Sequence, residues 1–170
     1  PSVYVLYTDY RYGWSELEVG LTLGLVGVCN ALVQAVLVRK LVPRIGERRA
    51  VGIGLACGIV GFVVMGVATT AEVFLLSIPL MALWGLAGPA TQSLVTQRIA
   101  PELQGRLQGS LASLVATAGI AGPLLFTAIF RLFIGEQPPA YVPGAAFLLS
   151  ALLLVSAWAL AHRATRPLAV

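Results

Sequence analysis

The stretch RKLVPRIGERR, residues 39–49, carries five positive charges and lies between two long apolar runs, residues 19–38 and 50–68. A helix of about 20 apolar residues spans the ~30 Å hydrocarbon core of a bilayer. A short, strongly basic connection between two such helices is typical of the cytoplasmic side. We therefore expect an integral membrane protein whose orientation is set by this stretch.

The composition points away from soluble proteins. Hydrophobic residues make up 58% of the 170 residues and charged residues only 11%, whereas soluble domains average about 25% charged residues. The net charge of +4 comes from basic residues between the apolar runs, where it reflects topology and attraction to lipid headgroups. We therefore expect membrane lipid, and no nucleic acid, as a partner.

Five complete spans and one partial span can be marked in the sequence. Only helices and closed barrels satisfy every backbone group in lipid, and these runs lack the alternation of barrel strands. The expected fold is therefore all-α. The chain opens like the end of a further helix, so we expect a fragment of a longer protein. The expected ranges are 1–8 (partial), 19–38, 50–68, 73–95, 107–130 and 141–161, followed by a tail, 162–170.

The basic residues are distributed unevenly between the two sides of the predicted bundle. Nine of the eleven Lys and Arg residues lie on the side of residues 39–49, and only Arg11 and Arg131 lie on the other. Because cytoplasmic loops carry the basic excess, we expect a cytoplasmic tail. The aromatic residues at the opposite boundary are expected to form an interfacial belt: Tyr4, Tyr7, Tyr10, Tyr12, Trp14 and Tyr141.

Glycine and proline occur at regular places inside the spans. Glycines four residues apart allow helices to approach closely in a membrane, and three such pairs occur: Gly20/Gly24, Gly54/Gly58 and Gly105/Gly109. Gly-Pro pairs at residues 88–89 and 122–123 predict kinks. Such kinks either provide the bend that a transporter needs or serve static packing.

Few polar side chains interrupt the apolar runs. Asn30 and Gln34 are four residues apart and therefore share one side of a helix, and Trp84 and Gln92 are roughly aligned eight apart. An amide in hydrocarbon needs a partner or water, so these residues either line a cavity or join helices by hydrogen bonds. The sequence has no nucleophile–base pair, phosphate loop or metal-ligand cluster. We expect no catalytic residues, no metal site, no cofactor and no enzymatic activity.

The spacing of these features resembles the carboxyl-terminal half of a major facilitator superfamily transporter, from the end of its seventh helix to its twelfth. PRIGERR resembles the loop that this superfamily repeats between the second and third helices of each half. Gly46, Arg48 and Arg49 fit that loop, and Arg44 takes the place of its first Arg. Pro43 stands where the family usually has Asp.

Five phrases in order are similar to the tetracycline-efflux group of drug:proton antiporters: YTDYRYGW, GLTLGLVGVCNALVQA, IGERRA, QGRLQGSLASL and GPLLFTAIF. Gln34 matches a glutamine of that group's substrate pathway. Two positions depart from the group, because Asn30 stands where a histidine is usual and Gly58 where an acidic residue is usual.

The resemblance implies a bacterial inner-membrane efflux transporter that exports an amphipathic, tetracycline-like drug in exchange for protons by alternating access. Its partner would be an amino-terminal six-helix half that carries the coupling carboxylate. A metabolite or sugar carrier of the same superfamily and a non-transporting membrane subunit are the alternatives. The expected substrate-binding residues are Asn30, Gln34, Trp84 and Gln92, and the expected conformational residues are Arg44, Gly46, Arg48, Arg49, Gly122 and Pro123.

Overall fold

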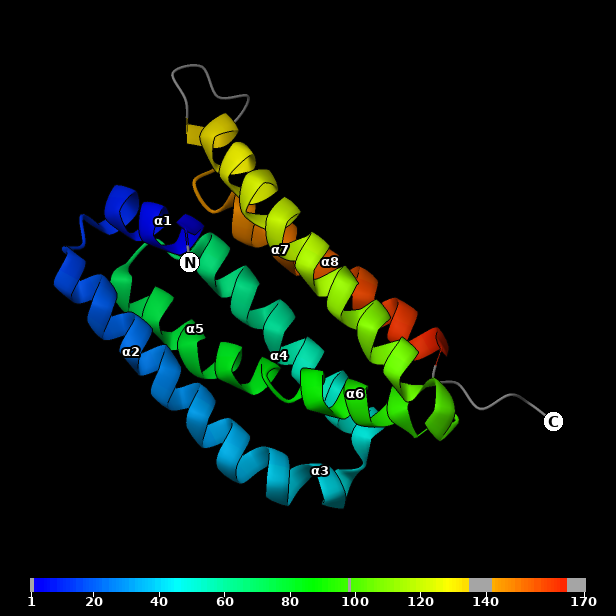
Figure 1. The fold of residues 1–170 in the computed structure, drawn as a ribbon. Coiled ribbons are helices and arrows are strands. Elements are labelled where there is room, and N and C mark those ends of the chain that lie inside the picture. The colour runs from blue at the N-terminus through cyan, green and yellow to red at the C-terminus, as the bar shows by residue number, and fades with distance from the viewer. Residues whose placement is uncertain (1, 98, 135–141, 165–170) are drawn as a thin grey trace.

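The computed structural model describes residues 2–97, 99–134 and 142–164, and every regular element in this part of the chain is a helix (Figure 1). The expected all-α fold is thus confirmed. The order of elements is α1 (Ser2–Tyr12), α2 (Glu16–Leu32), the π-helical turn η1 (Val33–Val38), α3 (Arg39–Ile45), α4 (Glu47–Val67), α5 (Ala71–Trp84), α6 (Ala87–Thr96), the 3-10 turn η2 (Pro101–Leu103), α7 (Gln104–Ile134) and α8 (Ala145–Ala164).

Five helical segments of the described chain are long and apolar enough to cross a membrane. The first of them continues through the first half of the basic stretch, which the sequence alone suggested was a loop. The helix ends only at Gly46, whose φ of 83° belongs to a backbone region that favours glycine. The five segments are Glu16–Ile45, Glu47–Val67, Ala71–Thr96, Pro101–Phe133 and Ala145–Arg163.

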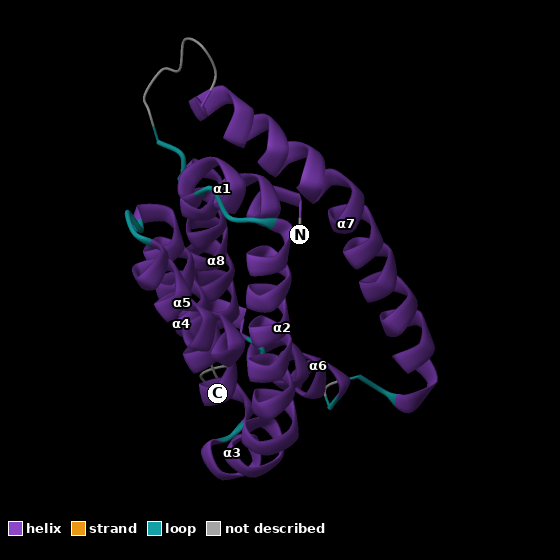
Figure 2. Ribbon diagram, turned by 90° about the vertical axis from the view of Figure 1, so that its left-hand side faces the viewer, coloured by secondary structure: helices purple, strands orange, loops and turns teal. Residues whose placement is uncertain are grey.

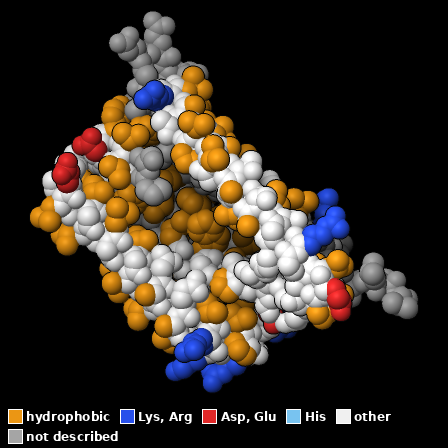
Figure 3. All heavy atoms as spheres, in the orientation of Figure 1, with side chains coloured by type: hydrophobic (Ala, Val, Ile, Leu, Met, Phe, Trp, Pro, Cys, Tyr) orange, Lys and Arg blue, Asp and Glu red, His pale blue; other side chains and the backbone are white. Residues whose placement is uncertain are grey.

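Helix α4 lies at the centre of the arrangement and packs against α5, α6 and α8. Helix α2 lies on the outer side of α5, and α7 contacts α8 and α1. Figure 2 shows α7 standing apart from α2. Charged side chains gather at the ends of the bundle, with Lys and Arg beside α3 (Figure 3).

The tyrosines near the start of the chain, which the sequence analysis expects to form an interfacial belt, make contacts inside the bundle. Tyr7 is 1% exposed and its ring stacks on Phe74 at a centroid distance of 5.7 Å. Its hydroxyl donates to the carbonyl of Met65, and the hydroxyl of Tyr12 donates to the carbonyl of Ala68. The last carbonyls of a helix lack intrahelical partners, so these tyrosines cap the end of α4. Tyr141 lies outside the described residues.

The glycine pairs differ in their surroundings. A Cβ on Gly54 would lie 2.8 Å from the backbone nitrogen of Ala87, so α4 and α6 pack closely there. At the other two predicted pairs, Gly20/Gly24 and Gly105/Gly109, a Cβ would have no heavy atom within 4 Å. Among these three pairs, only the one on α4 brings helices together within the part of the chain that the structure describes.

Candidate functional site

Helices α5 and α6 belong to one apolar segment that is broken between Trp84 and Ala87. The break lacks one backbone donor, because Pro89 has no N–H to donate to the carbonyl of Gly85, four residues earlier. That carbonyl instead accepts a hydrogen bond from Nε2 of Gln34, on the neighbouring helical segment, at 3.3 Å. A side-chain amide thus replaces the donor that proline removes.

Asn30 lies beside the same break. Its Nδ2 donates to the carbonyl of Val26 at 3.0 Å, which leaves Oδ1 as an acceptor. A Cβ on Gly85 would lie 3.5 Å from both Asn30 Oδ1 and Gln34 Nε2. The structure therefore brings the two amides and the backbone carbonyl into one polar cluster, here called the amide cluster. Gln34 of this cluster belongs to η1, and π-helical turns occur frequently at functional sites.

Trp84 and Gln92 lie elsewhere. The indole of Trp84 points to α4, where it contacts Phe62 at a centroid distance of 5.5 Å. A Cβ on Gly58 would lie 2.9 Å from the same indole. The indole of Trp84 thus fills the space beside Gly58. Gln92 donates to Oε1 of Gln108 on α7 at 3.3 Å, so the four expected substrate residues divide among three places.

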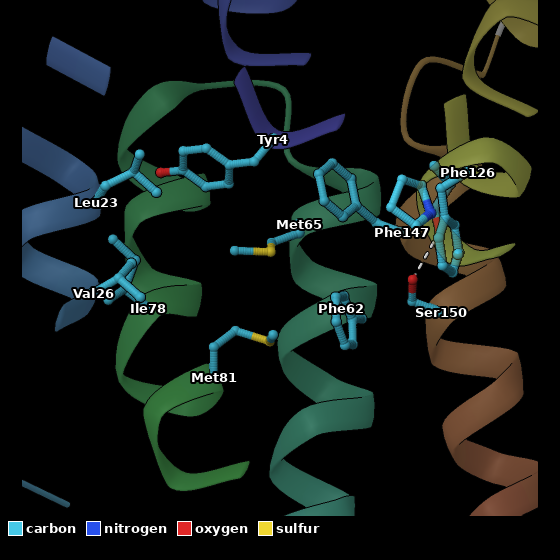
Figure 4. Close-up of a pocket in the computed structure, with 13 residues that line it drawn as sticks. Tyr4, Leu23, Val26, Phe62, Met65, Ile78, Met81, Phe126, Phe147 and Ser150 are labelled. Atoms are coloured by element: carbon cyan, nitrogen blue, oxygen red, sulfur yellow. Dashed lines mark hydrogen bonds between the residues drawn. The ribbon is translucent and has the colours of Figure 1, made fainter. Parts of the chain in front are cut away.

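A cavity of about 460 Å³ opens between α2 and α7 on the hollowed face of the molecule (Figures 3 and 4). Its volume lies in the range of about 300–1,000 Å³ that small-molecule sites occupy. Aromatic, methionine and aliphatic side chains dominate its lining, and Gly122 and Pro123 of α7 contribute to it. The other lining residues include Tyr4, Leu23, Val26, Phe62, Met65, Ile78, Met81, Phe126, Phe147 and Ser150.

The cavity and the amide cluster adjoin along α2. Val26 lines the cavity, and its carbonyl accepts the hydrogen bond of Asn30 one turn further along the helix. The arrangement offers an apolar chamber with hydrogen-bonding groups next to it. Sequence reasoning missed the apolar lining residues, because a leucine that faces a cavity and a leucine that faces lipid look alike in a hydrophobic run.

Helix α7 remains continuous across Gly122 and Pro123. A Cβ on Gly122 would have no heavy atom within 4 Å, which places open space beside this residue. Both residues line the cavity wall, and the bending expected of them stays a prediction.

The basic stretch is tied to α6 through a residue that the sequence analysis did not single out. Oε1 of Glu47 accepts hydrogen bonds from Ser93 Oγ at 3.2 Å and from Gln97 Nε2 at 3.0 Å. Gln97 also donates to Ser93 Oγ at 3.0 Å. The signal in the sequence was the position of Glu47 directly after Gly46 and the spacing of four between Ser93 and Gln97. Three side chains expected to act in conformational change are exposed: Arg44, Arg48 and Arg49.

In the described residues, no three His, Cys, Asp or Glu side chains come together in a way that could hold a metal ion.

Comparison with known proteins agrees with this architecture. The model of the Major Facilitator Superfamily matches residues 2–169. The class C tetracycline resistance protein of Escherichia coli is 34% identical over 76% of this chain and 33% of its own length. The class G protein of Vibrio anguillarum is 36% identical over 79% of this chain and 34% of its length. The class H protein of Pasteurella multocida is 32% identical over 99% of this chain and 42% of its length. No solved structure matches the chain. The chain spans about a third of the length of the first two relatives.

Proposed function

Because this chain belongs to the major facilitator superfamily, we propose that it serves as one half of a secondary transporter that exports an amphipathic, tetracycline-like drug in exchange for protons. The observation that carries this proposal is the 460 Å³ cavity beside the amide cluster. The three relatives described above are named tetracycline resistance proteins, which supports the drug class.

The chemistry of the cavity suits an amphipathic drug better than a sugar. Transfer of fused or aromatic rings from water to an apolar lining is favourable by about 25 cal/mol for each Å² of apolar surface that is buried. A sugar would need a hydrogen-bond partner for each of its hydroxyl groups, and the lining offers few. The amides of Asn30 and Gln34 would meet the polar edge of the drug.

Alternating access requires a second half against which this one can rock. Two segments are hardly buried within this chain, Glu16–Ile45, which contains α2, and Pro101–Phe133, which contains α7. In each of them, only 6% of the most apolar 18-residue window is buried. In the proposed transporter these helices contact lipid and an amino-terminal six-helix half. The basic stretch with Arg44, Arg48 and Arg49 lies on the cytoplasmic side, as does the carboxyl terminus.

The α5–α6 break is the proposed bending point of this half. A helix whose interior hydrogen bond has been replaced by a side chain bends at a lower cost than a continuous one. On this proposal Gln34 holds the break in one geometry through the carbonyl of Gly85. The sequence has no acidic residue in the middle of a span, so the coupling carboxylate belongs to the other half.

The proposal is tested with the complete gene in a bacterial host that lacks its own drug pumps. Gly122→Leu fills the cavity from a position with open space beside it. It should lower tetracycline resistance and raise the drug content of the cells. Gly119→Leu on the same helix is the matched control, because Gly119 also has open space and does not line the cavity.

Equal tetracycline accumulation in cells with and without the wild-type gene would refute drug export. Unimpaired export by the Gly122→Leu variant would show that the drug uses a different site.

A further inference from the structure

A second, smaller pocket lies at the basic end of the bundle, between the first two turns of α4 and the last turns of α8. Arg48, Gly52, Trp158 and His162 line it, with Val51 and Leu94 among its apolar residues. Its volume is about 50 Å³, whereas a drug site needs at least about 300 Å³. Since one water occupies about 30 Å³, the pocket accepts a single compact group.

The pocket has an apolar floor and a basic, aromatic rim. Val51 is 6% exposed and packs in the contact between α4 and α6. The ring of His162 stacks on Trp158, with centroids 5.9 Å apart and planes inclined by 19°. Gly52 lies beside the indole, since a Cβ there would be 4.0 Å from Nε1 of Trp158. The rim therefore brings together a guanidinium, an imidazole and an indole N–H.

These groups favour an anion, and a phosphate in particular. A guanidinium matches the geometry of phosphate oxygens, and the indole N–H is a pure donor. The first turns of α4 add the positive end of a helix dipole. Glu47 precedes Arg48, but its Oε1 accepts hydrogen bonds from Ser93 and Gln97 on α6.

We propose that this pocket binds the phosphate of an anionic phospholipid such as phosphatidylglycerol. A basic pocket between helices at the membrane surface is where such headgroups bind, and the indole at the rim suits the interface. Trp158 is 43% exposed, and the apolar side chain of Val155, three residues earlier on α8, is also 43% exposed. The acyl chains of a lipid bound by its phosphate would contact this apolar surface. Free phosphate has no chains to make that contact. The proposal depends on the membrane location of the chain and is independent of the transported drug.

The test is native mass spectrometry of the protein purified from its complete gene. Phosphatidylglycerol, phosphatidylcholine and sodium phosphate are added in separate titrations. The wild type should retain phosphatidylglycerol more tightly than phosphatidylcholine. Arg48→Gln should weaken this binding about fivefold, because one basic side chain near an anionic membrane contributes about 1 kcal/mol.

Two further variants distinguish binding in this pocket from a general attraction between the basic surface and an anionic lipid. Gly52→Leu fills the pocket without changing a charge and should also weaken phosphatidylglycerol binding. Arg106→Gln removes an arginine from the first turns of α7, outside the pocket, and should leave the binding unchanged. Trp158→Phe removes the indole N–H but keeps an aromatic ring, and this third variant replaces Arg48→Gln if Arg48→Gln does not fold.

Equal retention of the two lipids would overturn the proposal. An equal loss in Arg48→Gln and Arg106→Gln would show diffuse attraction, and unchanged binding in Gly52→Leu would exclude this pocket. Displacement of the lipid by millimolar sodium phosphate would identify free phosphate as the ligand.

Discussion

Replacing Gly54 by alanine should loosen the packing of α4 against α6. The new Cβ would lie 2.8 Å from the backbone nitrogen of Ala87 and 3.1 Å from its Cβ, whereas unstrained carbon contacts lie at about 3.5–4.0 Å. Overpacking of this kind costs about 1–3 kcal/mol, and alanine returns up to about 1 kcal/mol through its better helix propensity. We expect a net loss of about 1–2 kcal/mol in the free energy of unfolding.

The assay is a thermal melt of the protein in mild detergent, followed by circular dichroism at 222 nm. A loss of this size lowers the melting temperature by about 3–6 °C in a chain of this length. Gly27→Ala is the matched control, because it changes the same residue type within a helix where a Cβ meets no heavy atom within 4 Å.

A second variant tests the atomic cause. Adding Ala87→Gly to Gly54→Ala removes the 3.1 Å contact but keeps the backbone nitrogen at 2.8 Å. It should therefore restore only part of the lost stability. A melting temperature for Gly54→Ala equal to or above that of Gly27→Ala would refute the reasoning.

Three further changes follow from the same structure. Gly58→Asp should destabilise the protein by about 3 kcal/mol or more, because the new side chain meets Trp84 and buries an unpaired charge; a thermal melt checks this, and added Trp84→Ala should recover part of the loss. Gln34→Leu removes the donor to the carbonyl of Gly85 and should cost about 1 kcal/mol, with faster amide hydrogen exchange around the α5–α6 break; unchanged exchange there would contradict the proposed support. Gly46→Ala forces a Cβ onto a backbone with φ 83° and ψ 150° and should cost about 1–3 kcal/mol in the same melt, so an unaltered melting temperature would count against this geometry.

Several features of the fold could be predicted because they depend on local chemistry. Long apolar runs must form helices in lipid, where each backbone group needs an internal partner. Helix α2 begins at Glu16, earlier than the predicted span that starts at residue 19, because Ser15 accepts from the backbone N–H of Glu18 and the Glu18 side chain accepts from Ser15 in return. Helical periodicity alone places Asn30 and Gln34 on one side.

The partners of these side chains could not be predicted, because they come from distant parts of the chain. Pro89 predicts a weakened helix from the sequence alone. Only the packing of α2 against α5 shows that the Gln34 amide donates a hydrogen bond to the carbonyl of Gly85. The contact of Glu47 with Ser93 joins residues 46 positions apart. No local sequence pattern predicts a contact between residues so far apart in the chain.

The sequence by itself determined that the chain is helical, that it spans a membrane several times and that its basic end lies beside residues 39–49. Length, polarity and charge suffice for these properties. Tertiary structure decided which glycines touch a neighbour, that Tyr7 is buried, and which apolar side chains line the cavity. Hydrophobicity is equally high on the lipid-facing and interior surfaces of a membrane helix, so only packing distinguishes the two.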